Sequence, residues 1–246
     1  MPRVDFFEAR EEDGHLVTCF RIADDRRELR WELPPGGKLK KGSEGWYVED
    51  AKGGRFIPNN EVTMRRLNDE QDAVGFEVLY IGQAYGKDGS RHALDRLQKH
   101  ETLQKISLQG ISDGYSLSLL LLEIEPNRML TLFNPHAKNK EQGRARIARG
   151  LDKLFDTNEA ERVTLYEASL IRYFQPKYNK EFRDSFPSTN LKVLADCYDK
   201  DFSGLVAEIC IDALPFKMFT TTVPRQQYHI ARCDLHDDEA RKMFFI

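Results

Sequence analysis

The sequence is poor in cysteine and has no long apolar run. Its 246 residues include four cysteines, and no two of them form a Cys-x-x-Cys pair. A structural zinc site is therefore not expected, and the cysteines are interpreted as reduced core residues. Apolar stretches such as residues 119–122 are far shorter than the roughly eighteen residues that a membrane-spanning helix needs, so no membrane association is expected.

The chain also lacks a surplus of charge. It has 37 Lys and Arg against 40 Asp and Glu, a net charge of −3, so whole-chain charge does not indicate a nucleic-acid partner. Residues 80–180 nevertheless hold 16 basic and 12 acidic residues, a mildly basic balance that fits a phosphate-binding face or arises by chance. The first residues lack the apolar segment of a signal peptide, which predicts a cytoplasmic protein.

The composition, with 40% hydrophobic and 31% charged residues, is that of a globular protein and excludes collagen, a coiled coil and full disorder. Turn residues and alternation predict a β-rich N-terminal region over 1–75, a mixed central region over 76–184 and a β-rich C-terminal region over 185–246. The expected strands are 5–9, 15–22, 28–32, 45–48, 76–81, 116–124 (buried and central), 129–133, 191–197, 205–211 and 216–223. The expected helices are 61–70, 90–106, 141–155 and 158–174, the last ending before Pro176.

The first group of candidate chemical residues follows the expected strand 76–81. Tyr80 is followed by Ile81 and Gly82, where the backbone can turn or approach a ligand closely. Arg96 and His100 are four residues apart and share a helix face. A guanidinium binds phosphate and offsets charge developing on it, while a phenol or imidazole can accept a proton from water. The alternative is a core tyrosine and a solvated helix face.

The second group lies at the end of the expected helix 158–174. Glu167 has largely apolar neighbours, so its carboxylate needs a cation or metal partner, and one carboxylate can hold Mg²⁺ together with water and substrate oxygens. Asn179 follows Pro176, and its amide could bind a phosphate, orient a water or cap a turn. Glu167 could equally be a surface residue at the edge of the helix.

Together the two groups resemble the GIY-YIG nuclease family. Tyr80-Ile81-Gly82 matches the YIG element, residues 96–100 resemble the arginine helix with its histidine, and residues 167–179 resemble the glutamate helix with its Pro-x-Tyr-Asn tail. The order along the chain is that of the family, and the resemblance covers about residues 76–180. It implies an α+β fold in which a small antiparallel sheet is flanked by helices, here with β-rich N- and C-terminal extensions.

The resemblance also implies the activity, which is metal-dependent hydrolysis of DNA phosphodiester bonds with Mg²⁺ or Mn²⁺. Glu167 would bind the metal, Arg96 would stabilise the scissile phosphate, and Tyr80 would help activate the attacking water, with His100 assisting. Asn179 would contribute to substrate binding.

Three departures from the family pattern affect the expected site. No Gly-Ile-Tyr stands shortly before Tyr80; the nearest counterpart is Gly45-Trp46-Tyr47, so Tyr47 is a candidate first-motif tyrosine, on a strand that residues 1–75 would contribute. The loop 85–90 is enlarged, which makes Lys87 and Arg91 candidate substrate contacts and Arg91 a rival of Arg96.

The third departure is an inserted basic helix within 135–155. Arg144 and Arg149 on this helix suit contacts with a nucleic-acid backbone, although a solvated helix face explains them equally well.

The sequence therefore predicts a metal-dependent endonuclease acting on nucleic acid, most simply double-stranded DNA, in restriction, phage defence, mobile-element or repair biology. The β-rich flanks would select a site, dock a protein partner or form a homodimer. The alternative is a catalytically inactive nuclease-like module that binds nucleic acid or protein.

Overall fold

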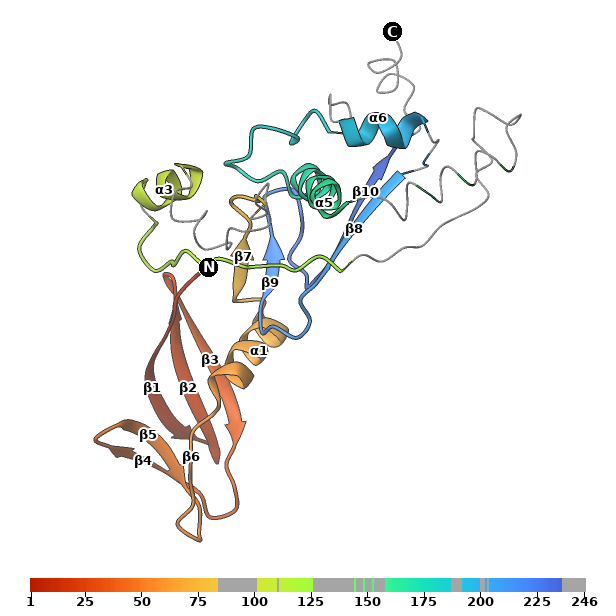
Figure 1. Ribbon diagram of the computed structural model, residues 1–246. Coiled ribbons are helices and arrows are strands. Elements are labelled where there is room, and N and C mark those ends of the chain that lie inside the picture. Colours follow the sequence, from red (N-terminus) through yellow and green to blue (C-terminus); the bar gives the residue numbers. More distant parts are fainter. Residues whose placement is uncertain are drawn as a thin grey trace.

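A computed structural model describes residues 1–83, 101–109, 111–125, 144, 148, 152, 158–186, 192–199, 202 and 204–235 (Figure 1). The described part of the chain is α+β, as expected, with small sheets and few helices. Among the helices within these ranges, none has both the length and the apolar character needed to cross a bilayer.

The first sheet is an antiparallel meander of β1 (Val4–Glu12), β2 (His15–Ile22) and β3 (Asp25–Glu32). The β1–β2 turn is built by Asp13 and Gly14, which both have positive φ, the conformation that tight hairpin turns require. The three strands expected here from alternation and turn residues are confirmed.

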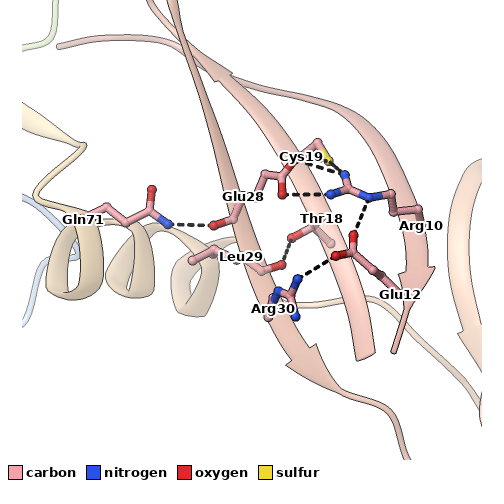
Figure 2. Close-up of polar contacts among 8 residues, drawn as sticks. All are labelled: Arg10, Glu12, Thr18, Cys19, Glu28, Leu29, Arg30 and Gln71. Atoms are coloured by element: carbon pink, nitrogen blue, oxygen red, sulfur yellow. Dashed lines mark hydrogen bonds and ion pairs between the residues drawn. The ribbon is translucent and has the colours of Figure 1, made fainter. Parts of the chain in front are cut away.

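The central strand β2 is buried on both faces, although the sheet borders solvent on one side. Val17 and Cys19 point to the outer face, yet they are 0% and 2% exposed. Figure 2 shows the charged side chains beside Cys19 on this face, where Arg10 bridges Glu28 (2.9 Å) and Glu12 (3.0 Å). The outer face is therefore closed by long charged side chains whose charges are paired.

A second antiparallel sheet comprises β4 (Lys38–Gly42), β5 (Gly45–Glu49) and β6 (Arg55–Phe56). One of its faces packs on the first sheet around a core of apolar side chains from both sheets. These are Ala9, Leu16, Trp31, Leu33, Leu39, Trp46 and Val48. The strand expected over 45–48 is confirmed.

Helix α1 (Asn60–Gln71) connects these sheets with the rest of the protein (Figure 1). Asn59 caps its start, and Leu67 is fully buried against the first sheet. On its other side, the amide nitrogen of Asn68 donates to the carbonyl of Pro215 (2.7 Å), and Lys217 pairs with Asp72 (3.0 Å). The helix expected over 61–70 thus holds the N-terminal sheets against the C-terminal half.

The C-terminal half is built around helix α5 (Glu159–Phe174), which lies beside the antiparallel pair β8 (Gly204–Cys210) and β10 (Tyr228–Asp234). Asn158 caps α5 in a reciprocal capping box with Glu161. Buried side chains from α5, β8 and β10 form one core. Residues on both sides of position 184 therefore contribute to the same core.

A second pair, β7 (Gly75–Glu77) and β9 (Lys217–Phe219), runs parallel. Two short helices complete the described elements, α3 (Glu101–Leu108) and α6 (Lys192–Asp199). The expected helix 90–106 is described only from Glu101, and the expected strand 129–133 lies outside the described residues. Within the expected helix 141–155, only positions 144, 148 and 152 are described, and they are helical.

Two strand predictions are wrong. The strand expected over 191–197 is one of them: residues 192–197 lie in α6, because Val193, Leu194 and Cys197 share one buried helix face rather than alternating between two faces of a strand. Residues 116–124 form no strand, and Leu119 to Leu122 are 39–59% exposed. Their apolar character is high, but no described strand offers this segment a hydrogen-bonding neighbour.

Candidate functional site

The segment that follows β7 is held in place by two neighbouring elements. The Val78 N–H donates to the carbonyl of Phe219 in β9 (2.9 Å), and the Leu79 carbonyl accepts from the Tyr178 N–H (3.0 Å). These bonds hold the segment between β9 and the turn that follows α5. The strand expected over 76–81 is thus a regular strand only through Glu77, and the residues after it are tied to their neighbours by single hydrogen bonds.

Asn179 holds the same segment through its side chain. Its Oδ1 accepts from the Ile81 N–H (2.9 Å), and its Nδ2 donates to the Ile81 carbonyl (2.8 Å). Asn179 is only 7% exposed, so its amide meets the backbone rather than solvent. The structure thus gives the Asn179 amide a positioning contact with Ile81, and its expected contact with substrate stays a prediction.

Glu167 lies beside this segment. It stands two turns before the end of α5 and is half-buried, and its Oε1 accepts from the Gln83 N–H at 3.2 Å. The half-buried carboxylate of Glu167 thus has the Gln83 backbone N–H as one hydrogen-bond partner. The structure therefore brings the glutamate helix to the residues that follow Tyr80-Ile81-Gly82.

Tyr80 lies against Gly82 in this segment. A Cβ placed on Gly82 would lie 2.7 Å from Cε1 and 2.8 Å from Oη of Tyr80, well inside van der Waals contact. Glycine at position 82 therefore lets the half-buried phenol lie against the exposed backbone of its neighbour. The phenol and the Glu167 carboxylate thus both lie next to residues 82–83.

The residue next to Glu167 has a different environment. Tyr166 packs against the core shared by α5, β8 and β10, and burial raises the pKa of its phenol. Tyr166 is therefore protonated at neutral pH and structural in character. Tyr166 therefore lies on the face of α5 that packs in the core, whereas Glu167 faces the segment that contains Gln83.

The structure describes only one of the predicted basic residues of the site, Arg144. Arg96, His100, Arg91, Lys87 and Arg149 lie outside the described residues. Arg144 is helical and exposed, without a described contact to the site.

Tyr47 occupies another part of the molecule. It lies on β5, whose hydrogen-bonded neighbours are β4 and β6, and Arg55 stacks on its ring at 4.7 Å. The strand that leads to Tyr80 pairs with β9 instead. Tyr47 is therefore not on a strand next to Tyr80, as a first-motif tyrosine would be.

The carboxylate oxygens of Glu167 are ligands of the kind that a hard divalent cation prefers. A carboxylate offers about four lone-pair positions, so one N–H bond at Oε1 is compatible with metal ligation by the same group. In the ranges that the structure describes, no group of three or more His, Cys, Asp and Glu side chains is arranged to hold a metal. A site in which one carboxylate is joined by water and substrate oxygens does not require such a group.

Two features of the site could not be recognised in the sequence. The backbone N–H of Gln83 contacts Glu167, and the backbone of Ile81 is clamped by Asn179. Every residue carries these backbone groups, so no residue type marks them in advance.

The chain matches no protein-family model, no curated protein and no solved structure.

Proposed function

We propose that this protein is a metal-dependent endonuclease of the GIY-YIG type that hydrolyses phosphodiester bonds in DNA. One observation carries the proposal: the Glu167 carboxylate lies 3.2 Å from the backbone N–H of Gln83, across 84 residues of sequence. This contact joins the two motifs on which the resemblance rests. A chance resemblance between distant fragments gives no reason for them to meet in the fold.

In this proposal each side chain has one role. Glu167 holds a Mg²⁺ or Mn²⁺ ion, which when bound supplies positive charge at the phosphate and lowers the pKa of water. Tyr80 orients the attacking water and accepts a hydrogen bond from it. Arg96 binds the scissile phosphate and offsets its developing charge, and His100 assists in proton transfer. Asn179 keeps the Tyr80 segment in register with the glutamate helix.

A nuclease-like module without catalysis is the second candidate. The placement of Tyr47 favours it, because Tyr47 and Tyr80 lie on strands of different sheets. A site with Tyr80 as its sole motif tyrosine has fewer groups available to activate water. The retained Glu167 and its contact with Gln83 favour the catalytic proposal.

Incubation with supercoiled plasmid separates the two candidates. The nuclease proposal expects conversion to open-circular or linear DNA in Mg²⁺ or Mn²⁺, and none in EDTA. Plasmid that is bound but never nicked in either metal would favour the binding module. Equal nicking with and without EDTA would contradict a metal-dependent mechanism.

A further inference from the structure

The sheet β4–β5–β6 has one apolar face and one basic face. Leu39, Trp46 and Val48 point toward the first sheet and pack in the core shared with it. Because side chains alternate along a strand and directly opposed residues share a face, Lys38, Lys40, Tyr47, Glu49 and Arg55 all point the other way. The structure describes the whole of this sheet, and nothing within the described residues packs on that outer face as a core.

The charges of the outer face are unbalanced. It carries three cations, Lys38, Lys40 and Arg55, and a single acidic residue, Glu49. Glu49 pairs with Lys40 and lies 3.6 Å from Arg55, so one carboxylate is shared between two cations. Lys38 is exposed, and the Arg55 side chain is 67% exposed even though it stacks on Tyr47.

The neighbouring sheet shows that this imbalance is local. On the outer face of β1–β2–β3, Arg10 is paired with Glu12 and Glu28, and Arg30 with Glu12 (2.6 Å; Figure 2). The long charged side chains of that face form ion pairs with one another and cover the buried residues beneath them. The outer face of β4–β5–β6 instead holds three cations against one carboxylate, so it keeps a net positive charge toward solvent.

We propose that the outer face of β4–β5–β6 binds the phosphate backbone of duplex DNA through Lys38, Lys40 and Arg55. This inference rests on the proposed function and adds a second contact region to it, remote in sequence from the nuclease motifs. Lys38 and Lys40 are two residues apart on one strand, about 6.8 Å at the usual rise. A DNA strand presents a phosphate about every 3.4 Å of helix axis, so two lysines at this backbone spacing can reach different phosphates of one strand.

The test compares two double variants with the same loss of charge. K38Q/K40Q removes two cations from the proposed face, and R21Q/K192Q removes two exposed cations from β2 and α6. Binding to a short fluorescein-labelled DNA duplex is measured by anisotropy in EDTA, across a range of salt concentrations. We expect K38Q/K40Q to bind about tenfold more weakly, with a salt slope smaller by about 2, while the control matches wild type.

Equal affinity and equal salt slope for the two double variants would overturn the inference, as would a wild-type chain without affinity for the duplex. Thermal unfolding of both variants checks that the sheet remains folded, which the exposure of the substituted lysines favours. The binding readout needs no cleavage. A wild-type protein that binds through this face but never nicks plasmid would overturn the proposed nuclease activity and support the present inference.

Discussion

The side-chain amide of Asn179 forms two hydrogen bonds with the backbone of Ile81, 98 residues earlier in the chain. Its oxygen accepts from the Ile81 N–H and its nitrogen donates to the Ile81 carbonyl. The two bonds pair the Ile81 N–H and carbonyl in the same way as the backbone of a neighbouring strand would. Because Tyr80 and Gly82 flank Ile81, the amide determines where the proposed catalytic phenol lies relative to α5.

Replacing Asn179 with alanine should destabilise the protein and disorder the site together. The Ile81 N–H and carbonyl would lose their partners in a poorly exposed place, at a cost of about 1–3 kcal/mol in the free energy of unfolding. Urea unfolding measures this cost. Lys180→Ala, an exposed neighbour in the same segment, is the matched control and should change stability by less than about 0.5 kcal/mol. Equal stability of the two variants would contradict a stabilising role for the Asn179–Ile81 hydrogen bonds.

Gly82→Ala should act on Tyr80 rather than on folding. The added methyl would lie 2.8 Å from the Tyr80 hydroxyl, so the phenol must move, while Gly82 itself is exposed. We expect plasmid nicking to fall at least tenfold with little change in unfolding free energy. The effects of Gly82→Ala and Tyr80→Phe should not add, because both remove the same positioned hydroxyl. Additive losses in the double variant would show that Gly82 acts by another route.

Acidification should destabilise the protein through His229. This histidine is fully buried, with Nδ1 3.2 Å from the Tyr173 hydroxyl and Nε2 3.0 Å from the Gln226 carbonyl. Burial lowers its pKa in the folded state, so the unfolded chain binds the proton more readily. Its contribution to stability is complete above the unfolded value of about 6.5 and is lost as pH falls toward the folded pKa.

The measurement is the free energy of unfolding in urea, followed from neutral pH to about pH 5. His229→Gln should be less stable than wild type at neutral pH and should show a shallower acid dependence. An acid dependence identical to that of wild type would remove His229 from the explanation.

Only one of the four thiols should react rapidly in the folded protein. Cys210 is exposed, whereas Cys19, Cys197 and Cys233 are buried. Burial also raises the pKa of Cys19 and of Cys233, which disfavours their reactive thiolates. Titration with a chromogenic disulfide should release one fast equivalent, and Cys210→Ser should abolish it. Fast reaction of two or more thiols in the native protein would contradict this packing.

Local patterns are enough to predict β1, β2, β3 and α5, because their determinants are local, whereas β4 and β6 are not predicted. The Asp13-Gly14 turn and the Asn158 cap act within a few residues. Apolar character wrongly predicts strands over 191–197 and 116–124, because it does not identify a hydrogen-bonding neighbour or the buried face. Strand β10 is not predicted, because its buried residues, His229, Ala231 and Cys233, are small or polar and form no strong hydrophobic run.

The candidate site was predicted in part for the same reason. Glu167, Tyr80 and Asn179 carry distinctive side chains, so a pattern could single them out. Their contacts are made with backbone groups of Ile81 and Gln83, which no sequence pattern marks. The role of Asn179 therefore emerged only from the fold.

The most direct test of the nuclease proposal is plasmid nicking by Glu167→Gln, compared with Glu159→Gln on the exposed first turn of the same helix. Both substitutions remove one carboxylate and keep the side-chain size, and circular dichroism verifies that each variant is folded. We predict that Glu167→Gln loses at least a hundredfold of the Mg²⁺- or Mn²⁺-dependent nicking rate, while Glu159→Gln retains it. Wild-type nicking by folded Glu167→Gln would contradict the proposed role of this carboxylate.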